Sequence, residues 1–435
     1  MLLPLLILLA VPVLAARAQS ADICSLCHSR LSYRQTEVAP HALWKGSIMA
    51  KAAQDPYFLA RVRYESNTAG LALDSKCLRC HAPAEPGGAG VNCSACHLLD
   101  TDFKVSARRQ AFGPHERPFE MPMLHHTGLT PTHSPHILDS ALCATCHTVV
   151  THPLGTPEGT EFLEQAPYLE WLASGYSKEQ RTCQSCHLPH LDGASYIAHR
   201  PPGGPFPPTR PRMPFGRHLF AGANYQVAPL AGADPGRALE QLQRSMTLTA
   251  TERGPGEIAV TVTNLAGHKL PTAYPSRRLW LHVKAFDSAG ALVFESGAFD
   301  RTTGELLAGA GFQAHYTFIS SPRQVQIYEA EYIDASGRPT LSLVAAAAYR
   351  KDNRILPRGF DPAAGQRVLP VGTDSDAAFA AGSHTTRYRL PRSARRVEVE
   401  ALYQSIKPAH LPPLGSLAAL DPTPAVAAKT EIALR

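Results

Sequence analysis

Alternating apolar and polar positions dominate the C-terminal part of the chain, whereas the N-terminal half has few long periodic stretches. Alternation with a period of two predicts strands that bury one face. It recurs in six segments, which are 257–263, 278–286, 291–295, 324–333, 385–390 and 396–403. Asp287–Gly290 and Asp334–Gly337 have the composition of hairpin turns. We therefore expect residues 229–435 to form an all-β domain, folded as a sandwich.

Helical signals in the rest of the chain are short. The Asp55-Pro56 pair is typical of a helix N-terminus and predicts a helix to about Asn67. Further helices are predicted over 41–50, 161–178 and 234–244. The Pro-rich stretch 200–216 predicts an extended connector. Residues 19–228 are accordingly expected to form a mostly α-helical or irregular domain, so the whole chain is multidomain.

An unbroken apolar run from Leu2 to Ala15 opens the chain, and Ala16-Arg17-Ala18 follows it. This order predicts a signal peptide over residues 1–18, cut after Ala18. An uncleaved anchor is the alternative, although the run is short for a membrane-spanning helix. No other stretch is long and apolar enough to span a bilayer. We expect an exported protein, periplasmic or extracellular, with no transmembrane segment in the mature chain; peripheral membrane association and oligomerisation are left open.

One motif, Cys-x-x-Cys-His (CxxCH), occurs five times in residues 19–228 and uses all ten cysteines. This spacing is the attachment signal for haem c, in which two thiols bind the porphyrin and the His coordinates the iron. Structural zinc and disulfides also use paired cysteines, but neither requires a His after each pair. We expect five covalently bound haem c groups, held by Cys24, Cys27 and His28, by Cys77, Cys80 and His81, by Cys93, Cys96 and His97, by Cys143, Cys146 and His147, and by Cys183, Cys186 and His187.

The second and third motifs are separated by a short tether, because Cys77 and Cys93 lie only sixteen positions apart. We expect their haems to be neighbours. The porphyrins would then supply much of the apolar core of this domain.

The formal net charge of +6 is misleading for a protein loaded with haem. Loss of Arg17 with the signal peptide leaves a charge of about +5, and five haems add about ten propionates and about five ferric charges, so the oxidised total falls to about zero and the reduced total to about −5. Many arginines are expected to pair with propionates. The basic residues do not cluster on a recognisable motif, so no nucleic-acid partner is expected.

Distal ligands on the second side of each iron have to come from outside the motifs. Of the twenty histidines, five belong to the motifs, which leaves fifteen. Candidates are His126 and His136 in the His-rich stretch 113–136, His218 after the connector, His268 in the Gly267-His268-Lys269 turn, and Met49. A thioether ligand would raise the haem potential. A structural loop His or a core Met is the alternative for each.

The haem domain resembles exported bacterial multihaem cytochromes c of the group around the tetrahaem cytochrome c of ammonia oxidisers. The resemblance lies in the motifs, in Trp44-x-x-Ser47-x-Met49-Ala50, in Ser140–His147 and in Cys183–His187 with the following Leu-Pro. In that group a Trp-x-x-Ser-x-His-Ala segment supplies a distal His. Met49 at this position implies His/Met ligation, or an open site. The C-terminal domain, with Gly267–Thr272 and Lys351–Phe360, looks like that of uncharacterised multihaem cytochromes of environmental bacteria.

Three functions remain open at this stage. The first is electron transfer between other redox proteins, a donor and an acceptor, which would make the chain an electron carrier rather than a catalyst. The second is an oxidoreductase acting on a small nitrogen or sulfur oxyanion at one open haem, with His115, His133 or Lys269 as polar groups. The absence of a Cys-x-x-Cys-Lys motif argues against that function. The third is a subunit of an extracellular haem filament, with the β-domain as its docking module.

Overall fold

A computed structural model describes residues 21–84, 87–105, 108–116, 120–199, 210–308, 311–373, 376, 379, 381–415, 417 and 420–435. The predicted signal peptide and residues 200–209 of the predicted connector lie outside these ranges. Within them, no helix has the length and apolar character needed to cross a membrane.

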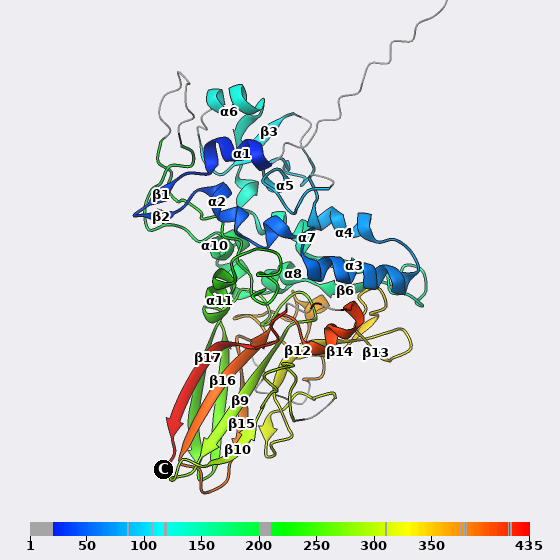
Figure 1. Cartoon of the computed structure of the whole chain (residues 1–435), viewed down its shortest axis with the longest axis vertical. Coiled ribbons are helices and arrows are strands. Elements are labelled where there is room, and N and C mark those ends of the chain that lie inside the picture. Colours follow the sequence, from blue (N-terminus) through cyan, green and yellow to red (C-terminus); the bar gives the residue numbers. More distant parts are fainter. Residues whose placement is uncertain are drawn as a thin grey trace, which may run out of the picture.

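Short helices make up most of the N-terminal half, and Figure 1 shows them gathered above the strands of the C-terminal half. The α-helices are α1 (Ala21–His28), α2 (Pro40–Lys45), α3 (Pro56–Ala69), α4 (Asp74–His81), α5 (Ser94–His97), α6 (Glu120–Thr127), α7 (Ser140–His147), α8 (Pro167–Leu172), α9 (Gly175–Lys178), α10 (Cys183–His187) and α11 (Pro235–Gln243). The 3-10 turns are η1 (Met49–Lys51), η2 (Pro135–Leu138), η3 (Gln366–Val368), η4 (Pro408–His410) and η5 (Pro412–Leu414).

Strands occur as short pairs among the helices and as two large sheets beyond them. The pairs are β1 (Ser32–Tyr33) with β2 (Thr36–Glu37), β3 (Gln110–Gly113) with β4 (Thr130–His133), and β5 (Val149–Thr151) with β6 (Phe162–Gln165). The remaining strands are β7 (Met246–Gly254), β8 (Glu257–Asn264), β9 (Arg278–Phe286), β10 (Leu292–Ser296), β11 (Phe318–Ile319), β12 (Ile327–Ile333), β13 (Pro339–Thr340), β14 (Ala348–Asp352), β15 (Ser383–Arg389), β16 (Arg396–Gln404) and β17 (Ala425–Ala433).

The two large sheets face each other across one apolar core. A seven-stranded sheet has the order β13-β12-β9-β16-β17, with β10 paired to β9 and β14 to β12, and a four-stranded sheet has the order β11-β15-β8-β7. Val260 of β8, Val283 of β9 and Val399 of β16 are fully buried in this core. β9 also buries Trp280 in a second cluster with Val325 and Leu402. β9 is therefore covered on both faces, and its apolar residues are buried on each side.

The strand predictions match most of the long strands, and the helix predictions match two of four. Asp55 caps α3 by accepting a hydrogen bond from the Tyr57 N–H at 2.9 Å, and α11 follows Asp234 as expected. The helix expected over 41–50 is interrupted, because α2 ends at Lys45 and η1 begins at Met49. The helix expected over 161–178 is wrong at its start, where 162–165 form β6, and it is then divided into α8 and α9.

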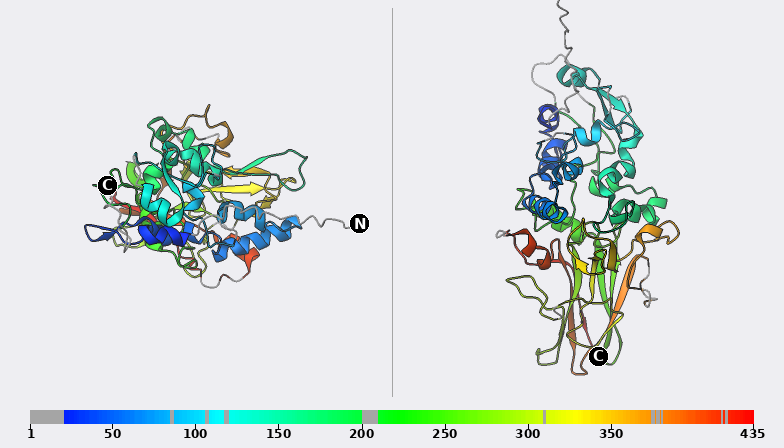
Figure 2. Two further views of the ribbon diagram at one scale, coloured as in Figure 1. Left: turned by 90° about the horizontal axis from the view of Figure 1, so that it is seen from above. Right: turned by 90° about the vertical axis from the view of Figure 1, so that its right-hand side faces the viewer.

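The helical half is elongated and continues the long axis of the sandwich, with the C-terminus at the far end of the sheets (Figures 1 and 2). The described part of the predicted connector is not a free link. Arg212 and Gly216 form bridges to Ser195 and His190, so this segment folds back on the helical half.

Buried contacts join the two halves. Glu65 of α3 accepts hydrogen bonds from the Ser342 hydroxyl and from the backbone N–H groups of Leu343 and Val344 at 2.7–3.2 Å. The Tyr332 hydroxyl donates to the Glu164 carbonyl at 2.6 Å.

Candidate haem sites

Each CxxCH motif occupies the end of a short helix, with its His as the last helical residue in α1, α4, α5, α7 and α10. Positions i, i+3 and i+4 of a helix share one face. The two thiols and the imidazole of each motif therefore project to the same side. This arrangement is the one that a porphyrin bound through two thioethers and one axial imidazole requires.

Backbone carbonyls orient four of the five motif imidazoles. The Nδ1 atom of each lies 2.6–2.8 Å from a carbonyl oxygen, and the pairs are His28 with Ile197, His81 with Ala52, His97 with Phe112, and His187 with Ala221. A metal-binding His commonly donates its second N–H to such an acceptor, which fixes the tautomer. With the proton on Nδ1, the lone pair of Nε2 is free for a metal.

Burial keeps the motif imidazoles uncharged. It lowers the pKa of His28, His81, His97 and His187, and it lowers that of His147 to about 4. Neutral imidazole is the form that binds metals. The local environment thus favours ligation over protonation at neutral pH.

Two of the predicted distal histidines lie opposite motif histidines. The ring centroids of His97 and His218 are 6.2 Å apart with planes inclined by 19°, and those of His187 and His268 are 6.4 Å apart with planes inclined by 22°. An imidazole nitrogen binds a metal at about 2.0 Å and lies about 1.1 Å from its ring centroid, so two imidazoles on one ion have centroids about 6.2 Å apart. The observed spacing fits one iron between each pair.

The backbone orients these two additional histidines in the same way as the motif histidines. The Nδ1 atom of His218 lies 3.1 Å from the Gly216 carbonyl oxygen, and that of His268 lies 2.9 Å from the carbonyl oxygen of Lys269. Burial lowers the pKa of His218 to about 3 and also lowers that of His268. Both are therefore neutral, with Nε2 available.

The other three distal candidates are placed differently. His136 uses both ring nitrogens, since Nδ1 lies 2.6 Å from the Ser134 hydroxyl and Nε2 lies 2.8 Å from the Leu99 carbonyl oxygen. The structure therefore does not support His136 as a ligand. His126 is exposed on α6. Met49 begins η1, where its carbonyl accepts the Val91 N–H at 3.0 Å, close to the third motif.

Contacts between thiols show which motifs are neighbours. Three pairs of thiols lie close enough to shift each other's pKa: Cys24 and Cys93, Cys80 and Cys146, and Cys143 and Cys183. Cys96 is also close enough to Cys146 for that thiol to raise its pKa, after the larger effect of burial. The motifs are thus connected in the order first, third, fourth and fifth, with the second joined to the fourth. A short tether joins the second and third motifs, but their thiols have different neighbours.

A cavity of about 270 Å³ adjoins the fifth motif, and Cys186 and His187 form part of its wall. Arg217, Arg237 and Arg244 also line it, together with the carboxylates of Glu37 and Glu240. Three guanidinium groups beside a candidate haem site are suited to binding carboxylates.

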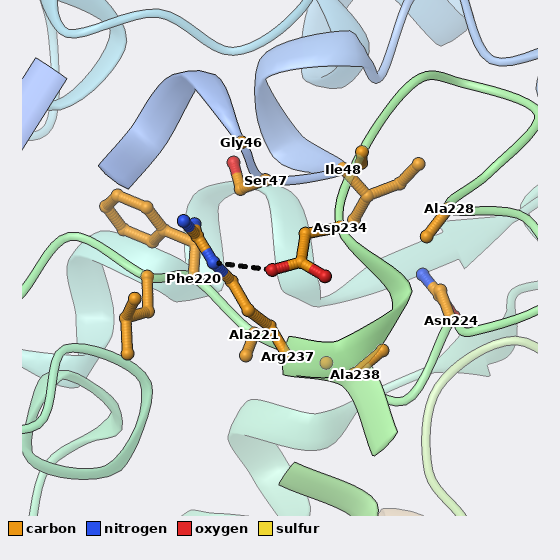
Figure 3. A pocket seen from close by; sticks show the side chains of 13 residues that line it. Gly46, Ser47, Ile48, Phe220, Ala221, Asn224, Ala228, Asp234, Arg237 and Ala238 are labelled. Carbon is orange, nitrogen blue, oxygen red and sulfur yellow. Dashed lines mark ion pairs between the residues drawn. The ribbon is translucent and has the colours of Figure 1, made fainter. Parts of the chain in front are cut away.

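Arg237 forms a boundary between this cavity and a much smaller one of about 20 Å³. Figure 3 shows Arg237 facing Asp234 at the start of α11, with Nε and Oδ2 3.4 Å apart. The Arg237 guanidinium also donates to the Leu43 carbonyl at 2.6 Å. These contacts fix α11 against α2 and the 219–222 segment that carries Ala221, the acceptor for His187.

Four buried charges hold the turn that presents His268. The Lys269 ammonium donates to Asp352 at 2.6 Å, and Arg354 binds the same carboxylate at 2.7 Å. Glu170 of α8 accepts the Lys269 backbone N–H at 3.0 Å and lies 3.4 Å from Arg354. Two cations and two anions balance, so the buried group is neutral. It ties the His268 turn to the helical half.

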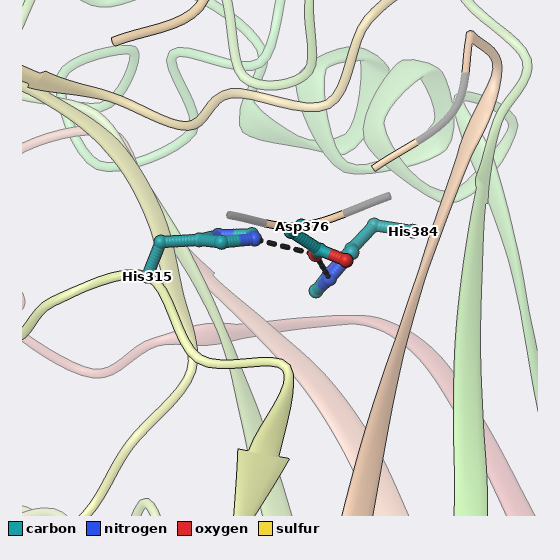
Figure 4. A group of neighbouring side chains, drawn as sticks. All are labelled: His315, Asp376 and His384. Carbon is teal, nitrogen blue, oxygen red and sulfur yellow. Dashed lines mark hydrogen bonds and ion pairs between the residues drawn. The ribbon is translucent and has the colours of Figure 1, made fainter. Parts of the chain in front are cut away.

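A second histidine cluster lies inside the sandwich, where His315 and His384 both approach Asp376 (Figure 4). Their Nε2 atoms are 2.7 and 2.8 Å from one carboxylate oxygen. The side-chain amide oxygens of Gln326 and Asn353 each accept a hydrogen bond from a backbone N–H. The NH₂ group of each amide therefore faces His315 Nδ1. Nδ1 is then an acceptor, and the His315 proton resides on Nε2. In this tautomer His315 donates a hydrogen bond to Asp376, and neither ring nitrogen has a free lone pair for a metal ion.

Several polar residues near the motifs were not singled out from the sequence. His199 lies close enough to His28 to lower its pKa, after the larger effect of burial. Tyr57, Arg61, Tyr274 and His410 meet at the boundary of the two halves. None of these belongs to a motif, and their partners are far away in the sequence, so no local pattern marks them.

Comparison with known proteins gives a match at the level of the fold. No protein-family model matches the chain, and no curated protein matches its sequence. A crystal structure of a penta-haem cytochrome c552 from Thermochromatium tepidum is similar, with a TM-score of 0.62 and 21% sequence identity, over 96% of this chain and 99% of that one. The chain therefore shares its fold with that protein over nearly its whole length.

Proposed function

We propose that the chain is an exported pentahaem cytochrome c that carries electrons between periplasmic or cell-surface redox partners. The observation that carries this proposal is the proximity of the thiols of the five CxxCH motifs, which form one connected series of neighbours. Electron transfer requires cofactors that lie close together, and neighbouring covalent attachment sites provide this. Haem c supplies a reversible one-electron couple when bound. The similar structure is that of a penta-haem cytochrome, which supports the same cofactor here.

The motif histidines act as proximal ligands, and His218 and His268 act as distal ligands of the third and fifth irons. Two imidazoles fill both axial positions, which leaves no site for a substrate at those irons. Met49 and His126 are the proposed ligands for two of the other three irons, and another histidine from outside the motifs is proposed for the last. Arg217, Arg237 and Arg244 neutralise propionates at the fifth motif. This division of roles favours a carrier over a catalyst.

The axial-ligand state of the oxidised protein tests the proposal. Mass spectrometry is expected to give five covalent haems, and electron paramagnetic resonance is expected to give low-spin signals alone. A stoichiometric high-spin haem would contradict the carrier function and favour an oxidoreductase acting on a nitrogen or sulfur oxyanion. Light scattering addresses the haem filament, because a monodisperse monomer excludes it.

Substitution of the thioether candidate gives a more local test. A thioether ligand raises the haem potential relative to a second imidazole. Met49→His is therefore expected to lower the midpoint potential of one haem and to leave the others in place. A redox titration in which no potential changes would show that Met49 is not a ligand.

A further inference from the structure

Four polar side chains meet where α3 packs against the C-terminal half, and we call them the interface cluster: Tyr57, Arg61, Tyr274 and His410. The Tyr57 and Tyr274 rings are 6.1 Å apart at 90°, and the Tyr274 and His410 rings are 6.3 Å apart. The Arg61 guanidinium carbon lies 5.8 Å from the centre of the Tyr274 ring. The four side chains are thus neighbours in the fold.

The cluster presents buried polar atoms that have no hydrogen-bond partner among the described residues. These atoms are the hydroxyls of Tyr57 and Tyr274, Nε and Nη1 of Arg61, and Nδ1 of His410. Tyr57, Arg61 and His410 are 8%, 4% and 1% exposed, and Tyr274 is half-buried although its hydroxyl is buried. Native proteins rarely leave buried donors unpaired, and each such group calls for an explanation. Four of the five unpaired atoms are donors, and together they indicate a missing acceptor.

The donors keep their protons. Burial raises the pKa of Tyr57 and raises that of Tyr274 well above the ordinary value for a phenol. Burial also lowers the pKa of His410 well below its ordinary value, so its imidazole is neutral. Arg61 uses only Nη2, which binds Glu65 and donates to the Leu341 carbonyl at 2.6 Å. Two phenol hydroxyls and three guanidinium N–H bonds, one on Nε and two on Nη1, therefore remain to be satisfied.

The interface cluster adjoins the second motif. Phe58, the neighbour of Tyr57, stacks on His81 with ring centroids 3.8 Å apart. Glu164 lies near both the second motif and the cluster. It raises the pKa of the Cys77 thiol, after the larger effects of burial and Asp74, and it also raises the pKa of Tyr274, after the larger effect of burial. A group bound within the cluster would therefore lie beside the second haem.

We propose that the interface cluster is a receptor for a carboxylate-like oxyanion beside the second haem. Guanidinium and hydroxyl donors are the groups that bind planar oxyanions well. Two sources share this chemistry: a propionate of the second haem, and a small oxyanion from solution. In either case the bound negative charge lies close to the second iron. The inference rests on the proposed haem loading.

Two tyrosine substitutions test the receptor with little disturbance, because Tyr57→Phe and Tyr274→Phe remove only unpaired hydroxyls. Tyr388→Phe is the matched control, since its hydroxyl is also buried and unpaired but lies in the sandwich core. If the oxyanion is a propionate, the double variant Tyr57→Phe/Tyr274→Phe is expected to shift one midpoint potential downwards, because a less well stabilised anion favours the ferric iron. The control is expected to leave all potentials unchanged.

Calorimetric titration with nitrite distinguishes the two sources. Saturable binding to the wild-type protein that is lost in the double variant assigns the oxyanion to solution. A potential shift without nitrite binding assigns it to the propionate. Unchanged potentials together with identical nitrite titrations would overturn the receptor. Haem counting by mass spectrometry is separate: fewer than five haems would refute the proposed cofactor content, whatever the tyrosine variants do.

Discussion

The candidate distal histidines differ in whether a ring nitrogen remains without a protein partner and can bind a metal. His218 has one nitrogen near a backbone carbonyl and faces the His97 ring, whereas both nitrogens of His136 have protein partners. Both residues are histidines from the same half of the chain, and the sequence alone ranks them together. The contacts of each ring nitrogen separate them.

The contrast between His218 and His136 gives a matched pair of variants. His218→Ala is expected to convert one low-spin haem to high spin, because the third iron loses its sixth ligand. His136→Ala is expected to leave every haem low-spin. Electron paramagnetic resonance of the two oxidised variants provides the comparison. A high-spin signal in the His136 variant instead would reverse the assignment.

Glu164 carries a pH dependence that can be measured as stability. Burial raises the pKa of this carboxyl to about 7, so the folded protein holds a proton there that the unfolded chain releases above about pH 4.5. The contribution of Glu164 to stability therefore falls as pH rises from about 4.5 to about 7, by about 3 kcal/mol in total. Glu164→Gln removes this fall, since an amide does not ionise.

Denaturant unfolding at pH 4.5 and pH 8 measures this effect. The free energy of unfolding of Glu164→Gln, relative to wild type, is expected to rise by about 3 kcal/mol between these values. The exposed Glu161 provides the control, and Glu161→Gln is expected to show no such rise. Parallel pH profiles for Glu164→Gln and wild type would contradict the assignment.

Among the elements, the turn that carries His268 is held by charges that come from three segments. Lys269 belongs to the turn, Asp352 and Arg354 to β14 and the segment after it, and Glu170 to α8. Removing one member of a buried, balanced group leaves a charge without its partner, which costs far more than the loss of an exposed ion pair.

Asp352→Asn is accordingly expected to lower the free energy of unfolding by about 3–5 kcal/mol. Asp192 offers the contrast, since its pair with Arg34 has side chains 68–70% exposed. Asp192→Asn is expected to cost less than about 1 kcal/mol. Thermal unfolding of both variants gives the comparison, and equal losses would show that the buried group does not hold the turn.

Local patterns in the sequence predicted the elements well only where each element was determined by its own residues. β9 was predicted with its observed ends, because it is central and strongly apolar, and α3 was predicted because Asp55 and Pro56 mark its start. β17 was missed because its Ala-rich sequence has little alternation and its pairing with β16 fixes it. β6 was taken for helix because its pairing with β5 overrides local preference.

The same distinction holds for the candidate sites at the scale of the molecule. The CxxCH motifs are local signals, so the sequence located the attachment cysteines and proximal histidines as predictions. The opposition of His187 and His268 joins segments about eighty residues apart and depends on how the two halves dock. The interface cluster likewise takes Tyr57 and His410 from near opposite ends of the chain. Neighbours of this kind arise only from the completed fold.

The charge of the whole molecule depends on its cofactors more than on its side chains. The sequence alone has a net charge of +6 and an isoelectric point of about 8.8. Five haems would add about ten propionate charges and about five ferric charges, which brings the oxidised protein to about zero. Isoelectric focusing of the loaded, oxidised protein is therefore expected to give a value near neutrality, well below 8.8.

Reduction removes about five further positive charges, so the reduced protein should focus at a still lower pH than the oxidised protein. A variant in which serine replaces all ten motif cysteines cannot attach haem and should focus near the value for the bare sequence. If the loaded protein also focused near 8.8, the propionates would have to be protonated or the haem count would have to be far below five. Because focusing reports net charge alone, it tests the cofactor load independently of any ligand assignment.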